Sequence, residues 1–153
     1  MAIRYPRGRG VQTNWKQSFS KIEIGKGTCI SKGEKMAVLS IGTIGNTIVE
    51  LQKELPKNSV AHSNMRFVKP LDAQLLHSIF KKFKTILTIE DGTIVGGFGS
   101  AIIEFANKHN YKNAIKILGI PDTFIEHGKT EQLFNSIQLS KEHIKQEIVQ
   151  ILS

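Results

Sequence analysis

Four charged side chains come at or just after the ends of short apolar runs in this sequence. They are Arg66, Glu90, Asp91 and Asp122. If these runs are parallel strands, the four side chains lie along the carboxyl edge of one sheet, where open parallel sheets bind ligands. Carboxylates placed there can perform acid–base chemistry, although they more often cap helices or pair with arginines. We therefore expect structural roles for these residues and predict no catalytic residue in this chain.

A glycine-rich segment, Gly96-Gly97-Phe98-Gly99-Ser100, precedes a run of helical periodicity. Free backbone N–H groups at the start of a helix attract phosphate, so this segment is a candidate anion site. It lacks the Gly-Lys-Ser/Thr ending of a P-loop, and Ile102 stands where the dinucleotide-binding pattern has its third glycine. We predict that these glycines serve close packing of a strand against a helix, and we assign no cofactor-binding residue.

Histidine and cysteine have no spacing typical of a metal or nucleophile site. None of the five histidines forms an H-x-x-x-H or H-E-x-x-H pair, and Cys29 has no His or Cys partner nearby in the sequence. The histidines are His62, His77, His109, His127 and His143. We predict no metal ligand, and we expect His127 to be a turn residue whose side chain is hydrogen-bonded to the backbone.

Two arginines near the start differ from the other basic residues. The segment Arg4-Tyr5-Pro6-Arg7-Gly8 places a stiff proline between two guanidinium groups. Arginine binds phosphate through a planar, bidentate fork. An arginine on a linker beside a neighbouring domain can therefore hold an anionic substrate, whereas without such a neighbour the segment is a solvated basic tail.

Short apolar runs alternate with segments of helical spacing along most of the chain. Strands are predicted at 35–41, 59–65, 85–89 and 114–118, with a weaker edge strand or hairpin within 19–30. Helices are predicted from an N-cap at Thr43 to Pro56, from an opening at Pro70 with Asp72 as cap, after Ser100, at 130–137 and at 140–152. The predicted core includes Val38, Leu39, Leu75, Ile79, Ile102 and Phe105. This order predicts an α/β fold, a three-layer sandwich with a mostly parallel sheet of about five strands and helices on both faces.

The composition limits the class of partner. The chain has 153 residues and a formal net charge of +8, which suits one domain with a solvated basic surface and leaves an autonomous basic binding module as an alternative. The aromatic residues Tyr5, Trp15 and Tyr111 form no stacking series, so nucleic acid is not an expected partner. No apolar run approaches the roughly 20 residues of a membrane span, and the start lacks the apolar region of a signal peptide. With its single cysteine, the chain is expected to be cytoplasmic, without a membrane partner.

Taken together and in order, several segments resemble the C-terminal part of the 1-deoxy-D-xylulose 5-phosphate synthase family, thiamine-diphosphate enzymes related to transketolase. The resemblance runs from Ile3 to the C-terminus. It rests on Arg4-Tyr5-Pro6-Arg7-Gly8, Ile24-Gly25-Lys26-Gly27, Gly33-Glu34-Lys35, Met65-Arg66-Phe67-Val68-Lys69-Pro70-Leu71-Asp72, Thr88-Ile89-Glu90-Asp91-Gly92, Gly96-Gly97-Phe98-Gly99-Ser100 and Leu118-Gly119-Ile120-Pro121-Asp122-Thr123-Phe124-Ile125-Glu126-His127-Gly128.

The resemblance implies a division of the chain and a role for it. Residues 1–20 would be the linker from a preceding pyrimidine-binding domain, absent here, and 21–153 a transketolase C-terminal-like domain. In the family, the full enzyme condenses pyruvate with glyceraldehyde 3-phosphate, with decarboxylation, using thiamine diphosphate and Mg²⁺ bound by the preceding domains. The product feeds isoprenoid, thiamine and pyridoxal synthesis. This domain would then help to build a homodimer, lack activity and cofactor by itself, and contact the preceding domains of its own chain.

The resemblance also gives the two early arginines a role. Arg7 would hold the phosphate of the aldehyde substrate in the full-length enzyme, with Arg4 as its partner. One alternative is the same module from a transketolase or from the β subunit of a 2-oxoacid dehydrogenase. The segments Arg4–Gly8 and Ile120–Gly128 favour the synthase over these two.

Overall fold

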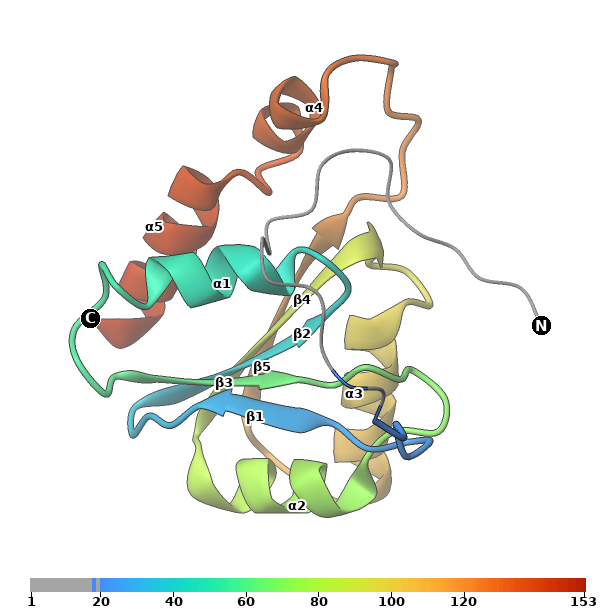
Figure 1. The fold of residues 1–153 in the computed structure, drawn as a ribbon, viewed down its shortest axis with the longest axis vertical. Coiled ribbons are helices and arrows are strands. Elements are labelled where there is room, and N and C mark those ends of the chain that lie inside the picture. Colours follow the sequence, from blue (N-terminus) through green and yellow to red (C-terminus); the bar gives the residue numbers. More distant parts are fainter. Residues whose placement is uncertain (1–17, 19) are drawn as a thin grey trace.

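A computed structural model describes residues 18 and 20–153, which form one sheet covered by helices (Figure 1). Most of the predicted linker, including Arg4 and Arg7, lies outside the described residues. The elements in chain order are β1 (Thr28–Ser31), β2 (Met36–Ile41), α1 (Gly45–Leu51), β3 (Val60–Asn64), α2 (Ala73–Lys82), β4 (Thr85–Thr93), α3 (Phe98–Lys108), β5 (Ala114–Ile120), α4 (Thr130–Ser136) and α5 (Lys141–Leu152).

The sheet has five strands in the order β1-β3-β2-β4-β5. The pairs β2–β3, β2–β4 and β4–β5 are parallel, whereas β1 runs antiparallel to β3 at one edge. Ala37 of β2 lies opposite Ala61 of β3 and Ile86 of β4. Because β3, β2, β4 and β5 run in the same direction, their carboxyl ends lie at the same edge of the sheet, as predicted.

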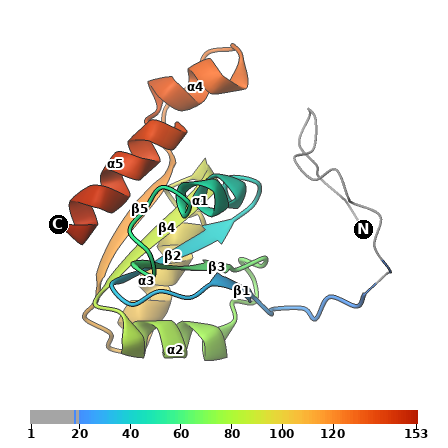
Figure 2. The ribbon, with the colours of Figure 1, turned by 60° about the vertical axis from the view of Figure 1, so that its left-hand side comes forward.

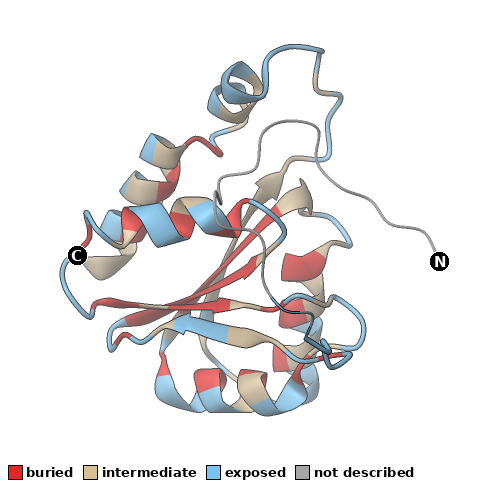
Figure 3. Ribbon diagram, in the orientation of Figure 1, coloured by how far each residue is buried: buried red, intermediate tan, exposed pale blue. Residues whose placement is uncertain are grey.

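The two faces of the sheet carry separate hydrophobic cores. Helices α1 and α5 cover one face and α2 and α3 cover the other, so that three layers are seen when the molecule is turned (Figure 2). Successive side chains of a strand point to opposite faces, which places Val38 in the first core and its neighbour Leu39 in the second. The central strands are accordingly buried along most of their length (Figure 3). The predicted three-layer α/β sandwich is confirmed.

The face of α2 that meets the sheet differs from the prediction by one residue. Val38, Leu39, Ile79 and Ile102 are buried, but Leu75 and Phe105 are only partly buried. The residues of α2 that are buried are Leu76, Ile79 and Phe80. The helix begins at Ala73, and tertiary packing decides which neighbouring positions of its apolar stripe turn inward.

The starts of two helices also need correction. Ile44 occupies the N-cap position of α1 without a capping side chain. The hydroxyl of Thr43, which we predicted as the cap, instead donates to the Asp91 carboxylate at 3.2 Å. Pro70 precedes α2 without opening it, because the helix begins at Ala73, and Asp72 caps it as predicted.

Helix α4 is the least embedded element. It has no buried residue, and Figure 3 shows it at one end of the molecule with an exposed surface. A long exposed connection, residues 121–129, joins it to β5. Within the described residues, no helix combines the length and hydrophobicity needed to cross a membrane.

Candidate functional site

Glu90 lies near the carboxyl end of β4 and is 5% exposed. Its two carboxylate oxygens accept hydrogen bonds from the backbone N–H groups of Phe98 and Gly99, both at 2.8 Å. These N–H groups belong to the first turn of α3, where the helix has no intrahelical acceptor for them and carries a partial positive charge. Glu90 therefore binds the helix start from a neighbouring strand, and the position that would attract a phosphate is filled by the protein's own carboxylate.

The glycine-rich segment makes room for this contact. A Cβ atom on Gly97 would lie 2.0 Å from the carbonyl oxygen of Thr93 and 2.5 Å from Oε2 of Glu90. A Cβ atom on Gly99 would lie 2.6 Å from Ile117 Cγ2 and 2.8 Å from Thr88 Oγ1. Gly97 and Gly99 thus allow α3 to approach β4 and β5 closely, which confirms the packing role predicted for these two glycines. Among the described residues, a Cβ atom on Gly96 would have no atom within 4 Å, so the role does not extend to that position.

The other predicted residues of the carboxyl edge do not converge on a reaction centre. Asp91 accepts the hydrogen bond from Thr43, which joins the loop after β2 to the last part of β4. Arg66 is exposed, with a φ of 59°, and its backbone N–H donates to the Asn64 side chain at 3.0 Å. Asp122 is exposed. Glu90 and Asp91 both accept hydrogen bonds that hold neighbouring elements together. The geometry therefore supports structural roles for these carboxylates over acid–base chemistry.

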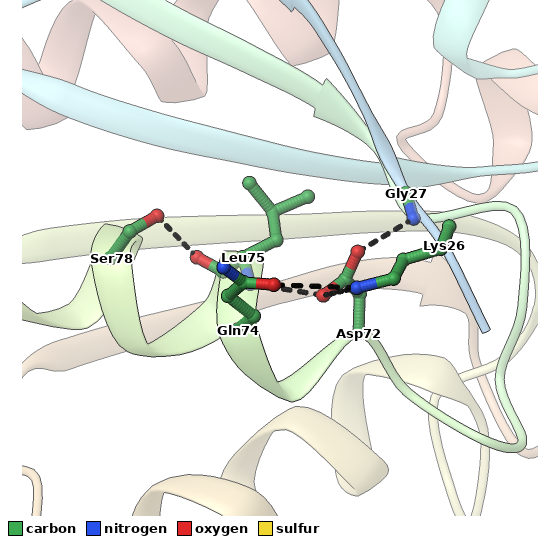
Figure 4. A network of polar contacts seen from close by, with 6 residues as sticks. All are labelled: Lys26, Gly27, Asp72, Gln74, Leu75 and Ser78. Atoms are coloured by element: carbon green, nitrogen blue, oxygen red, sulfur yellow. Dashed lines mark hydrogen bonds and ion pairs between the residues drawn. The ribbon is translucent and has the colours of Figure 1, made fainter.

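Asp72 forms a second buried carboxylate site, at the start of α2 (Figure 4). Oδ1 accepts from the backbone N–H of Leu75 at 3.0 Å, and Oδ2 accepts from the backbone N–H of Gly27 at 3.1 Å. The ammonium group of Lys26 lies 3.9 Å from Oδ1. The carboxylate thus caps its own helix and also binds the segment that leads into β1. This second contact spans 45 residues of sequence, and no sequence pattern predicted it.

His62 is the most deeply buried histidine of the described chain, at 1% exposure. Its Nε2 lies 2.8 Å from the hydroxyl oxygen of Ser40. Within the described residues its Nδ1 has no hydrogen-bond partner. Burial lowers the pKa of His62 from 6.5 to about 4, so the imidazole is neutral at physiological pH. This burial was not predicted from the sequence, because the pattern around a strand histidine does not show which face of the sheet it occupies.

Two other histidines pack between α2 and α3. His77 Nδ1 lies 2.8 Å from the hydroxyl of Tyr111, and the His77 and His109 rings are 4.6 Å apart. Reduced hydration, and then the nearby charges of His77 and Lys108, lower the pKa of His109. His127 is exposed, and in the described part of the chain its side chain forms no hydrogen bond, so the expected backbone contact is not found.

The described residues do not fit a thiamine diphosphate or Mg²⁺ site. They contain no group of three or more His, Cys, Asp or Glu side chains arranged to hold a metal ion. The helix start best suited to a diphosphate is occupied by Glu90. We therefore derive no chemical step through this cofactor at these residues.

A mixed sheet with one antiparallel edge strand and helices on both faces defines the class of this protein as a three-layer α/β domain. Residues 25–144 match the family described as "Transketolase, C-terminal domain", and the chain belongs to that family.

Bacterial proteins named 1-deoxy-D-xylulose-5-phosphate synthase are similar over most of the chain. The Cytophaga hutchinsonii protein is 52% identical over 134 residues, which are 86% of this chain and 21% of that protein. The Bacteroides thetaiotaomicron protein is 43% identical over 151 residues, 96% of this chain and 23% of that protein. The chain thus spans between a fifth and a quarter of the length of these relatives.

A solved structure shares the fold. It is described as "Split gene transketolase, inactive beta4 tetramer" and matches with a TM-score of 0.77 over 90% of this chain and 46% of that chain. Its sequence identity to this chain is 22%. At that identity the likeness concerns the fold alone.

Proposed function

We propose that this chain is the C-terminal domain of a 1-deoxy-D-xylulose 5-phosphate synthase. The observation that carries the proposal is the 52% identity over 134 residues to a protein of that name. The likeness to a transketolase, at 22% identity, supports the fold and gives no reason to prefer a transketolase as the parent enzyme. The full-length enzyme would condense pyruvate with glyceraldehyde 3-phosphate, with loss of carbon dioxide.

The role proposed for this domain is structural: it packs against the preceding domains of its own chain and helps to form a homodimer. Apolar side chains at the carboxyl edge support a packing role. Phe124, in the connection before α4, is fully exposed at 106%, and Val95, in the loop after β4, is 60% exposed. We place the contact with the preceding domains at these two loops, because they follow the neighbouring strands β4 and β5.

Thiamine diphosphate and Mg²⁺ belong, in this proposal, to the preceding domains, where they supply the carbanion chemistry of the reaction. The buried carboxylates Glu90 and Asp72 keep the α/β sandwich rigid and do not contact either group. The domain by itself would then be inactive, and the full-length protein would work in the cytoplasm.

Two chimeric enzymes test the assignment. In the first, this chain replaces the matching region of the Cytophaga hutchinsonii synthase. In the second, the same region is replaced by the C-terminal domain of a transketolase. We expect the first to be an active dimer and the second to lose activity or dimer formation, as measured by steady-state assay and sedimentation velocity. An inactive first chimera that is folded and dimeric would refute the assignment.

Arg7 is proposed to bind the phosphate of glyceraldehyde 3-phosphate in the full-length enzyme, with Arg4 beside it. In that enzyme, Arg7→Ala should raise KM for this aldehyde far more than KM for pyruvate. The loss of a charge-assisted bidentate contact costs about 1.5–3 kcal/mol, or roughly ten- to a hundredfold in kcat/KM. Arg7→Lys should recover part of the loss, because an ammonium keeps the charge without the planar fork.

A non-phosphorylated aldehyde is the internal control for this experiment. It should be almost indifferent to both substitutions, since it lacks the group that Arg7 binds. Equal losses with both aldehydes would assign Arg7 to the junction between domains and leave the family assignment intact.

A further inference from the structure

A pocket of about 320 Å³ lies at the amino edge of the sheet, away from the carboxyl-edge residues described above. Its walls are the loop that joins β1 to β2 and the loop that joins α1 to β3. Both loops lie on the left of the sheet in Figure 1. Neither the family resemblance nor the proposed function assigns a role to this place.

The two walls are held together by backbone hydrogen bonds. The N–H of Glu34 donates to the carbonyl of Asn58 at 2.9 Å, and the N–H of Lys35 donates to the carbonyl of Ser59 at 3.0 Å. The side chain of Gln52, on the second wall, also donates to the hydroxyl of Ser31 on the first. The pocket is therefore preformed, so a ligand would not have to order its walls on binding.

Gly33 brings the first loop close enough to form these bonds. A Cβ atom there would lie 2.2 Å from the backbone nitrogen of Ala61 and 2.2 Å from the carbonyl carbon of Val60. The ammonium group of Lys82 also donates to the Gly33 carbonyl at 3.0 Å. The loop is thus tied to β3 on one side and to α2 on the other.

The charges that line the pocket are of one sign. Its ionisable lining residues are Lys32 and Lys57, and no carboxylate lines it. Both lysines are exposed, and neither forms an ion pair with any described residue. Glu54 lies in the loop between α1 and β3 without lining the pocket, and it pairs with Lys141 and Lys145, whose hydrogen bonds lower its pKa to about 2. The two ammonium groups are therefore not neutralised locally.

The remaining lining residues complete an amphipathic site. Asn58 and Ser31 offer neutral hydrogen-bonding groups, whereas the exposed ring of Pro56 provides an apolar surface above the buried side chains of Leu55 and Val60. Two cations match a phosphate monoester, which carries about −1.5 to −2 charges at neutral pH. A volume of 320 Å³ is at the lower end of the range for small-molecule pockets, which favours a small ligand.

We propose that this pocket binds a small organic phosphate. The phosphate lies between the ammonium groups of Lys32 and Lys57, and a short apolar portion of the ligand packs on Pro56. This site is independent of the proposed substrate contact at Arg7 and of the parent enzyme's identity, because it uses only residues of this domain.

Titration of the ¹⁵N-labelled chain with phenyl phosphate tests the proposal by amide chemical shifts. We expect saturable shifts confined to the loops around Lys32 and Asn58. The double variant Lys32→Ala/Lys57→Ala should weaken binding by about tenfold or more, through the loss of both charged contacts. The matched control Lys81→Ala/Lys112→Ala removes the same charge from exposed lysines outside the pocket and should bind as the parent chain does.

Two further ligands separate the contributions. Phenol, which lacks the charge, should cause no saturable shift, and inorganic phosphate should bind more weakly than phenyl phosphate because it has no apolar part. The proposal is overturned if the control pair weakens binding as much as the pocket pair. It is equally overturned if phenyl phosphate produces no saturable shift, or shifts spread evenly over the lysine-bearing surface. An unchanged dispersion of the amide spectrum verifies that each variant is folded.

Discussion

The starts of α2 and α3 are each held by a buried carboxylate, but the two carboxylates come from different places. Asp72 immediately precedes α2 and caps it by accepting a hydrogen bond from the N–H of Leu75, three residues later. Glu90 belongs to strand β4 and reaches the N–H groups of residues 98 and 99, which are eight and nine positions later. Asp72 also binds a segment 45 residues away, whereas both oxygens of Glu90 go to one helix.

The Asp72 cap is therefore a local interaction, whereas the Glu90 cap is a tertiary one. Any sequence with Asp at the N-cap can form the first bond of Asp72, since the donor is on the same turn. The Glu90 bond requires β4 and α3 to be packed closely, and it requires glycine at 97 to admit the carboxylate. The α3 start should therefore be the more fragile of the two under substitution.

Gly97→Ala should have the largest effect on this comparison. The new methyl group would lie 2.0 Å from the Thr93 carbonyl and 2.5 Å from Glu90 Oε2, so both the backbone and the carboxylate must move. We expect a loss of at least about 3 kcal/mol in the free energy of unfolding, by overpacking and loss of the cap. Chemical denaturation measures it. Gly96→Ala is the neighbouring control for lost chain flexibility, with no atom within 4 Å of its Cβ but a φ of +70° that strains it. A smaller loss for Gly97→Ala than for Gly96→Ala would contradict the packing argument.

His62 extends the comparison to a buried polar side chain that, unlike Glu90 and Asp72, has an atom without a hydrogen-bond partner in the described chain. Its contribution is measured by the pH dependence of stability. The pKa of His62 is about 4 in the folded chain, below its ordinary value of 6.5, because of burial. The unfolded chain therefore binds a proton that the folded chain does not, and stability present above pH 6.5 is lost as the pH falls toward 4. The expected loss is about 3 kcal/mol.

Denaturation midpoints between pH 7 and pH 4 measure the His62 contribution. His62→Gln should flatten the pH dependence in this window, even if it lowers stability at pH 7. His127→Gln, at an exposed position, should leave the slope unchanged. The same slope in the parent chain and in His62→Gln would mean that another group titrates there.

Glu90→Gln keeps the shape of the side chain but presents an amide in place of the carboxylate. One of its two former acceptor positions becomes an NH₂ donor that faces a backbone N–H group of α3. We expect a loss of about 1.5–3 kcal/mol, the range for hydrogen bonds to charged groups, measured by urea denaturation at pH 7. A change near zero would show that the helix start tolerates a neutral partner.

Asp72→Asn should have the smallest effect, about 1 kcal/mol or less. Asparagine is a good N-cap, so its Oδ1 can still accept from Leu75. The NH₂ group that replaces Oδ2 cannot accept from Gly27, so only that partly buried bond is lost. Hydrogen exchange should then increase at Gly27 and along β1 more than within α2. Equal exchange increases in both places would indicate that the bond to Gly27 and the cap are not separable.

The alternation of strands and helices could be predicted because it depends on local patterns. Strand and helix periodicities are visible in the sequence, and the β-branched run at 85–89 became the first part of β4. The Asp72 cap could be predicted for the same reason, since donor and acceptor lie within one turn. The motifs that carry the family resemblance are likewise contiguous in the sequence, and residues 25–144 match the transketolase C-terminal family.

What only the tertiary structure decided concerns partners distant in the sequence or choices between adjacent positions. Glu90 binds Phe98 across a loop, and Thr43 binds Asp91 on another strand. Asp72 binds Gly27, which precedes β1, the strand that pairs with β3. Leu76, and not Leu75, entered the core, because a shift of one residue moves a side chain by about 100° around a helix and only packing against the sheet selects between them. Sequence periodicity determined that this chain has an apolar stripe on each helix and a row of polar groups after its strands. The three-dimensional arrangement determined which of these groups are buried. Burial depends on which elements pack together in space, and no local pattern shows which distant elements these are.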